Sequence, residues 1–482
     1  MWINNSKYQI EENGDFTYTI KPTGDMKTSV TLFLSDKIIV EDEALKQITD
    51  AASIDPESFV FATPDIHTGY GVPIGSVWVT PNFISPSAVG YDINCGMRLL
   101  STPYRAEEVE IERIASRIAK LIPLGEGKKN LKLKPKEIKA ILKEGLPATE
   151  ELLIRYGLIG NAEELKLLSY DILHTEDTGS LKGNPEKIPP KAVERGIPQM
   201  GTLGGGNHFI EIQEVTDIYD KKAGEFLGLF KGQLTVMIHS GSRGLGHEVA
   251  GHYMKLAKKY MTKTGLVAPN AQLLYFHLHS KEGKDYLRAM NSAANYAFAN
   301  REVITFLIRR AFRETMGERT FYDVRSVYDV THNIAKEETY HEKKYTVHRK
   351  GATRAFDMER MKGTPFESLG QPVLIPGSMG TASYVLLGHK TSIRSFYSVN
   401  HGAGRVLSRK QAAGKKGREA LISDREFKRA MEGVYLICDD RRRIKEEAPQ
   451  AYKDIDDVIE VVIGAKLALP VARMRPLGVL KG

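Results

Sequence analysis

VGYDINCGMR, residues 89–98, is the stretch around which the fold and the chemistry of this chain can be organised. It places Asp92 and Cys95 three residues apart, between Gly90 and Gly96. A carboxylate and a thiolate together offer a hard and a soft ligand to one metal ion. Alternatively, Cys95 is only a small buried hydrophobe, as a single cysteine often is. The first interpretation requires further candidate ligands elsewhere in the chain.

Three strand-like runs carry a histidine at one end. QLTVMIH ends at His239, RSVYDVTH ends at His332, and NHFIEIQ has His208 as its second residue. Strand ends on a rigid scaffold can hold side chains in a cleft. One such histidine is usually a hydrogen-bonded structural residue, but three of them, each beside Asn, Ser or Gly, favour a ligand set that includes Asp92 and Cys95.

The hydrophobic patterning predicts a mixed α/β (α+β) protein. Strands and short helices fill residues 1 to about 100, and Lys- and Glu-rich segments such as EIERIASRIAKLI predict a helical insertion or lobe over about 106–198. Glycine-dense motifs follow, separated by helices predicted near 247–263 and 281–316. A length of 482 residues allows two or three domains or one large unit.

Composition narrows the class of protein. With 41% hydrophobic and 27% charged residues, the sequence has no apolar stretch of the roughly 18 residues that a membrane helix requires. The first twenty residues lack the plan of a secretory signal, and two cysteines are too few for a disulfide framework, so we expect a soluble cytoplasmic protein. The net charge of +8 favours a polyanion such as RNA or DNA, although surplus lysine on solvated faces would give the same charge.

Four other histidines are interpreted as structural or surface residues. HEVAGH resembles the zinc-protease motif H-E-x-x-H, but His247 and His252 are five residues apart and would point about 140° apart on a helix. They therefore cannot share one metal ion. His277 and His279 could lie on one strand face, but they have no acidic residue close by.

Glycine-rich segments raise the possibility of phosphate binding. GTLGGGNH, HSGSRGLGH and PGSMGTAS would let backbone N–H groups approach an anion, although each could equally be a tight turn. They match neither a P-loop nor a Rossmann element. Arg243, Lys350, Arg354 and Arg405 add cations suited to phosphate. His401, in HGAGR, could be a nucleophile, a metal ligand or a general base.

These segments, together with DIHTGYGVPIGSV, THN, HRKGATRA and the terminal RPLGVLKG, resemble the RtcB family of GTP-dependent RNA ligases. The likeness follows the family's motif order along nearly the whole chain and is weakest before Gly201. It implies a single catalytic unit over 1–482 with a deep cleft. It also implies an enzyme that joins RNA 3′-phosphate or 2′,3′-cyclic phosphate ends to 5′-hydroxyl ends, as in tRNA splicing and RNA repair.

The resemblance also assigns roles to residues. Cys95 would bridge two Mn²⁺ ions, with other divalent ions possible; Asp92 and His208 would complete one site, and His239 and His332 the other. His401 would attack the α-phosphate of GTP and form a histidine–GMP intermediate, oriented by Asp65. Arg243, Lys350 and Arg354 would contact RNA phosphate, Arg243 among the catalytic residues. Guanylate contacts would come from Asn207, His208, Phe209, Ile210, Glu211, His332, Asn333, Pro376, Gly377, Ser378, Met379, Ser383, His401, Gly402, Ala403, Gly404 and Lys481.

Two other functions compete with the ligase. A metal-dependent phosphoesterase would need the metal site and the basic surface but no covalent GMP. An RNA-binding protein or chaperone would need the basic surface alone. His401 in HGAGR and Lys481 favour the ligase. Its expected partners are RNA, either tRNA exon halves or broken RNA, and an archease-like activator protein; we expect a monomer that does not bind membranes.

Overall fold

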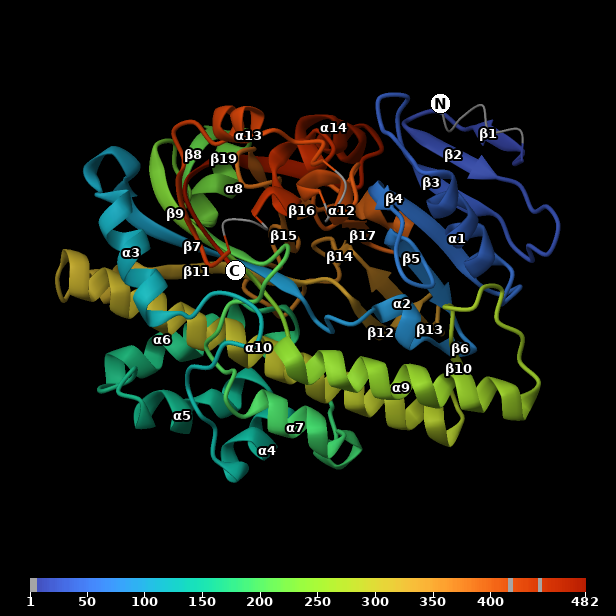
Figure 1. The fold of residues 1–482 in the computed structure, drawn as a ribbon, viewed down its shortest axis with the longest axis horizontal. Helices are drawn as coiled ribbons and strands as arrows, with labels where there is room; N and C mark the ends of the chain where they lie inside the picture. Colours follow the sequence, from blue (N-terminus) through green and yellow to red (C-terminus); the bar gives the residue numbers. More distant parts are fainter. Residues whose placement is uncertain (1–6, 415–418, 441–443) are drawn as a thin grey trace.

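The computed structural model describes residues 7–414, 419–440 and 444–482. Two β-sheets form the upper part of the molecule in Figure 1, and the long helices α9 (Arg243–Thr264) and α10 (Lys281–Met316) run beneath them. This arrangement confirms the predicted mixed α+β class.

The first sheet has seven strands in the order β1-β2-β3-β4-β5-β13-β12. All neighbours are antiparallel except β3 and β4. Its strands are β1 (Ile10–Glu12), β2 (Thr17–Ile20), β3 (Val30–Phe33), β4 (Phe59–His67), β5 (Ile74–Thr80), β12 (Ile334–Tyr340) and β13 (Lys343–Lys350).

The second sheet carries the candidate ligands. Its order is β11-β7-β9-β8-β19-β16-β15, with β18 parallel to β19 and every other pair antiparallel. All eight residues of β9 are buried, as expected for a strand covered on both faces. The strands are β7 (Gly96–Arg105), β8 (Phe209–Ile218), β9 (Gln233–Ser240), β11 (Arg325–Thr331), β15 (Pro372–Ile375), β16 (Ser383–Gly388), β18 (Tyr435–Cys438) and β19 (Ala468–Lys481).

Helix α10 is the central helix of the core. It begins after Ser280, whose side chain accepts a hydrogen bond from the Gly283 nitrogen, and its middle part is buried on every side. A helix buried all round must neutralise any charge it carries. Accordingly, Arg301 pairs with Asp329 of β11 and also donates hydrogen bonds to the carbonyl oxygens of Asn94 and Ser240. These bonds connect α10 to the loop before Cys95 and to the end of β9.

Residues 106–198 are helical, and their helices gather with α9 and α10 on one side of the sheets (Figure 1). Helices α3 and α4 pack on α10, and α7 packs on α9. Whether the segment is an insertion stays a prediction, and parts of the predicted unit 1–482 lie outside the described residues. The segment contains α3 (Ile111–Leu121), α4 (Pro135–Glu144), α5 (Glu150–Arg155), α6 (Ala162–Leu173), α7 (Pro190–Gly196), and the 3-10 turns η2 (Ala106–Glu108), η3 (Leu146–Thr149), η4 (Glu176–Gly179) and η5 (Pro185–Lys187).

The remaining elements are short, apart from α1 and α14. Within the three described ranges, none of the helices combines the length and apolar character needed to cross a bilayer. The elements are α1 (Asp42–Ala52), α2 (Pro86–Val89), α8 (Lys221–Phe226), α11 (Thr320–Asp323), α12 (Arg409–Ala413), α13 (Asp424–Ala430), α14 (Ile455–Gly464), β6 (Phe83–Ile84), β10 (Phe276–His277), β14 (Ala352–Arg354), β17 (Ser398–Asn400), η6 (Lys390–Ser395), η7 (Ile444–Glu447) and η8 (Pro449–Ala451).

Candidate metal centre and nucleotide pocket

Strand pairing brings the predicted ligands to one edge of the second sheet. Cys95 directly precedes β7, His208 directly precedes β8, His239 is the next-to-last residue of β9, and His332 directly follows β11. These four strands are neighbours in the order β11-β7-β9-β8, and each pair is antiparallel. The starts of β7 and β8 and the ends of β9 and β11 therefore meet at the same edge.

The ligand atoms lie in contact. The Cys95 Sγ atom is 3.2 Å from Nε2 of His208 and 3.1 Å from Nε2 of His239. On one side, His208 Nε2 is 2.7 Å from Oδ2 of Asp92. On the other, Nε2 of His239 is 3.1 Å from Nε2 of His332. Cys95 thus stands at the centre of a row of five donor groups.

The donor set fits a cation. The ligand atoms of Cys95, His208 and His239 all lie within 4.8 Å of one another, and all three residues are buried. Burial lowers the pKa of His239 and of His332 well below 6.5, which keeps both imidazoles in the neutral form that binds metal. Burial, reinforced by Asp92, raises the pKa of the Cys95 thiol, so a thiolate here needs a positive ion beside it.

Two glycines of the predicted phosphate-binding motifs instead make room for ligands. A Cβ on Gly204 would lie 1.8 Å from Nδ1 of His208. A Cβ on Gly241 would lie 2.3 Å from Oδ1 of Asp92. Real Cβ atoms do not approach other atoms so closely, so both positions need glycine for close packing against a ligand side chain.

His401 is held by a buried carboxylate. Its Nδ1 lies 2.7 Å from Oδ2 of Asp65, and its backbone nitrogen donates to the same oxygen at 3.3 Å. Thr63 donates to the other oxygen at 2.6 Å. Although burial acts against it, these hydrogen bonds lower the pKa of Asp65, which stays ionised. Asp65 therefore orients the ring and leaves Nε2 for chemistry, with the ring centroid 4.7 Å from that of His332.

Most of the predicted guanylate contacts line one cavity, with a volume of about 390 Å³. Four do not: His208 lines an adjoining cavity, Ile210 is part of the hydrophobic core, and Glu211 and Ser383 are buried and joined by the side-chain amide of Gln213, which donates a hydrogen bond to each. Burial raises the pKa of Glu211 to about 7. The predicted residues on the wall are Asn207, Phe209, His332, Asn333, Pro376, Gly377, Ser378, Met379, His401, Gly402, Ala403, Gly404 and Lys481.

A second cavity, of about 710 Å³, adjoins the first. Arg243 lines it and is fixed there, with Nε donating to Thr202 and Nη2 donating to the carbonyl of Gly125. His208 and His247 also line it. Residues that line both cavities are Tyr91, Asp92, Asn207, Arg409, Glu447 and Lys481.

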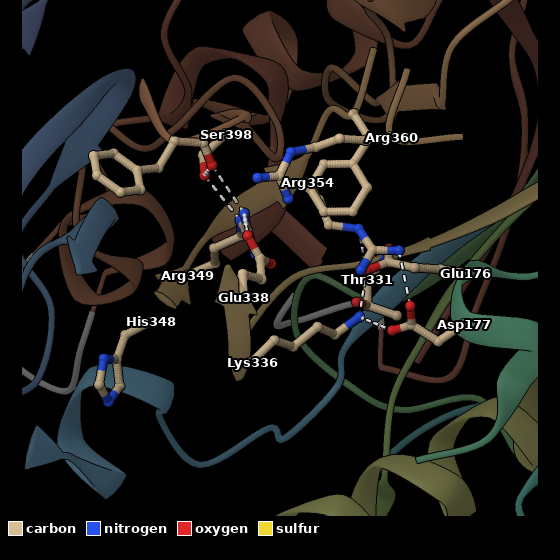
Figure 2. A network of polar contacts seen from close by, with 12 residues as sticks. Glu176, Asp177, Thr331, Lys336, Glu338, His348, Arg349, Arg354, Arg360 and Ser398 are labelled. Carbon is tan, nitrogen blue, oxygen red and sulfur yellow. Dashed lines mark hydrogen bonds and ion pairs between the residues drawn. The ribbon is translucent and has the colours of Figure 1, made fainter. Parts of the chain in front are cut away.

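Two of the predicted phosphate-binding cations are engaged within the protein. Figure 2 shows Arg354 in a buried network in which it pairs with Asp177 at 2.9 Å and with Glu176 at 3.4 Å. Arg354 shares these two carboxylates with Lys336 and lines neither cavity, so its proposed contact with RNA phosphate stays a prediction that this network does not support. Lys350 lines the first cavity, but its Nζ donates to the carbonyl oxygens of Tyr70, Val72 and Ser87, and burial lowers its pKa to about 7.

Several wall residues have no motif that could have revealed them. Glu447 accepts hydrogen bonds from Arg405 and Arg409 and also from Tyr452, yet it lies in a charged, helical part of the sequence. Tyr91 is next to Asp92, which is the only signal for it in the sequence.

A row of thiol, imidazole and carboxylate donors beside a carboxylate-held histidine, opening on a cavity, has the ligand chemistry of a metal-binding enzyme site. The chain matches the family model described as tRNA-splicing ligase RtcB over residues 47–482 and belongs to that family. This confirms the resemblance found in its motifs.

Relatives named as RtcB ligases are similar to this chain along most or nearly all of its length. The chain is 40% identical to the tRNA-splicing ligase RtcB of Archaeoglobus fulgidus over 477 residues, which covers 95% of both chains. It is 40% identical to the protein of the same name from Thermococcus kodakarensis over 480 residues, again 95% of both. It is 41% identical to the RNA-splicing ligase RtcB of Mycobacterium tuberculosis over 436 residues, or 88% of this chain and 96% of that one.

Proposed function

We propose that this chain is an RNA ligase that joins RNA 3′-phosphate or 2′,3′-cyclic phosphate ends to 5′-hydroxyl ends, as in tRNA splicing and RNA repair. The observation that carries the proposal is His401, anchored through Nδ1 to the buried Asp65 at 2.7 Å and placed beside the ligand row. The family to which the chain belongs supports the same activity.

His401 is the proposed nucleophile. Its Nε2 lone pair attacks the α-phosphorus of GTP, a P–N bond forms, and pyrophosphate leaves. The ring gains positive charge as this bond forms, and the ionised Asp65 stabilises that charge through Nδ1–H. An oxygen of the RNA 3′-phosphate then displaces His401 from the GMP phosphorus. A cyclic end is first opened by water to the 3′-phosphate.

Sealing completes the cycle. The 5′-hydroxyl oxygen of the second RNA attacks the phosphorus of the activated 3′-phosphate, GMP leaves, and the hydroxyl proton passes to solvent or to a base in the site. The product is an ordinary 3′,5′-phosphodiester. The proposed RNA substrates are tRNA exon halves or broken RNA. Arg243, which lines the second cavity, would contact their phosphates.

The ligand row is proposed to hold two Mn²⁺ ions, or other divalent ions, with Cys95 shared between them. Asp92 and His208 would serve one ion, and His239 and His332 the other, as their separate contacts with the two sides of the row suggest. When bound, such ions neutralise charge on phosphate oxygens during group transfer.

The first cavity is the proposed guanylate site. At about 390 Å³ it falls within the usual range for small-molecule pockets, roughly 300–1,000 Å³. The loop 376–379 and the run 402–404 supply backbone groups close to His401, and Lys481 supplies a cation. Cytoplasmic location, a monomeric state and an archease-like activator are part of the same proposal.

The test is incubation with Mn²⁺ and GTP labelled at the α-phosphate, followed by denaturation and measurement of label on the chain. Acid-labile label on the wild type and none on His401→Ala is expected. Equal label on both proteins would refute the nucleophile. If the wild type opens cyclic ends but takes up no label, the chain is a phosphoesterase; if it binds RNA without turnover, it is a binding protein.

A further inference from the structure

Tyr91 is an exposed aromatic residue at the junction of the two cavities. It lines both of them, and 36% of its surface remains accessible. It is also the chain neighbour of Asp92, the carboxylate at one end of the ligand row. An exposed tyrosine thus stands next to one end of the ligand row, where the two cavities meet.

The Tyr91 ring is held in a set orientation. It stacks on His247, with centroids 4.8 Å apart and an interplanar angle of 25°. Its Cε1 atom lies 4.0 Å from the position of a Cβ on Gly251, one turn further along α9, so the ring packs over bare helix backbone. The Tyr70 ring contacts the Tyr91 ring edge-on, with a centroid distance of 5.7 Å and an interplanar angle of 63°. A ring fixed in this way loses little side-chain entropy when a ligand stacks on it.

The second cavity is lined by four cations, which can contact an RNA backbone, and also by six carboxylates, those of Asp92, Glu126, Asp439, Asp440, Glu446 and Glu447. Arg195, Arg243 and Arg409 line it together with Lys481, and the first and third are 43% and 52% exposed. It contains neither the loop 376–379 nor His401, which both lie on the wall of the first cavity. A nucleic acid strand can therefore enter past Tyr91 without occupying the guanylate site.

We propose that Tyr91, backed by His247 and flanked by Tyr70, is a stacking platform for the nucleobase next to an RNA end that is being joined. This inference rests on the proposed RNA ligase function. A stack on the tyrosine accepts any base, since every base has a π-face, and it would hold the terminal phosphate or hydroxyl close to Asp92 and His208. Stacking of this kind would position the RNA end in a ligase that acts on many sequences, because it imposes no sequence preference.

The experiment places 2-aminopurine at the terminal nucleotide of a short RNA, at the 3′ end in one arm and at the 5′ end in the other. RNA binding to the Mn²⁺-loaded wild type without GTP should quench the fluorescence in at least one arm, which identifies the end that stacks. Tyr91→Ala should lose the quenching and weaken binding by about 5- to 100-fold, the range of one base–aromatic stack. Tyr91→Phe should retain both properties.

Controls separate this inference from the ligase proposal. Tyr219→Ala removes another exposed tyrosine, which stacks on Tyr384 outside both cavities, and should behave like the wild type. Because Tyr91 also lines the guanylate cavity, labelling of His401 by GTP is measured separately in Tyr91→Ala, whereas the RNA-binding assay contains no GTP and reports on the RNA alone. An abasic terminal nucleotide should weaken wild-type binding but add nothing to Tyr91→Ala.

Unchanged quenching and RNA affinity in Tyr91→Ala would refute the stacking role of Tyr91. So would a further loss of affinity when the RNA with an abasic terminal nucleotide is tested on Tyr91→Ala. A protein that takes up no label from GTP but still shows Tyr91-dependent quenching would refute the ligase and keep the stacking site.

Discussion

The carboxylate of Glu176 accepts a hydrogen bond of 3.0 Å from the backbone nitrogen of Thr331, the residue that precedes the proposed ligand His332. Its other oxygen pairs with Lys336 of β12, and both groups are buried (Figure 2). A side chain from the helical segment 106–198 thus fixes the end of β11, where one of the proposed ligands begins.

Glu176→Gln should therefore destabilise the protein and weaken metal binding. The change leaves Lys336 and Arg354 facing only Asp177, and a buried cation that loses a partner typically costs about 3 to 5 kcal/mol. Denaturant unfolding and the Mn²⁺ content of the purified protein measure the two effects. Glu57→Gln, which breaks the exposed pair with Lys343, is the matched control and should change neither quantity noticeably.

Cys95→Ser should reduce the amount of bound metal and abolish GTP labelling while the protein stays folded. Serine keeps the size of the side chain but replaces a soft thiolate donor by a hydroxyl, which binds such ions poorly. Elemental analysis gives the metal content and circular dichroism the fold. Cys438→Ser, in β18, is the control for loss of a thiol. Full metal content and labelling in Cys95→Ser would remove the cysteine from the site.

Gly204→Ala should disturb the ligand row without any change in a ligand. The new methyl group would lie 1.8 Å from Nδ1 of His208, so the ring or the glycine-rich turn must move. We expect at least a tenfold loss of Mn²⁺ affinity, comparable to the loss of a residue that orients a ligand. Gly160→Ala, whose Cβ would meet its nearest neighbour at 3.6 Å, should bind Mn²⁺ as the wild type does.

Glu211 should make the stability of the fold depend on pH. Its folded pKa, about 7, is above the ordinary value of 4.5, so its contribution is fully present below pH 4.5 and is lost as the pH rises through 7. At about 1.4 kcal/mol per pKa unit, the loss is about 3 kcal/mol. Urea unfolding of the wild type and Glu211→Gln at pH 5 and pH 8 measures it. A difference between the two proteins that is the same at both pH values would contradict the raised pKa.

The sequence predicted the ligand row because its signals are local. Each of the histidines at 208, 239 and 332 stands at the end of a strand whose hydrophobic run is visible in the sequence. Antiparallel pairing of these strands then brings the three side chains together. The fold class was predictable for the same reason. The order of the strands was not, because several pairings, such as β7 with β9 and β8 with β19, join segments more than 100 residues apart.

The contacts that the sequence did not reveal join residues that are distant in the sequence. Arg354 looked available to phosphate because its partners, Glu176 and Asp177, lie about 180 residues earlier in the chain. His247 of α9 was rejected as one of a pair of metal ligands. Its helical spacing could not reveal that it stacks on Tyr91, which lies in a distant loop. Charge pairing and ring contacts of this kind depend on the tertiary structure.

The convergence of β11, β7, β9 and β8 has a further consequence for how the protein matures. The donor groups meet only when all four strands have paired in register, and a slip of one residue would turn His239 to the opposite face. A partly folded chain therefore offers an incoming ion an incomplete set of donors. Metal uptake would act as a proofreading step: it captures molecules whose sheet is finished and, by mass action, withdraws them from the pool that can still unfold.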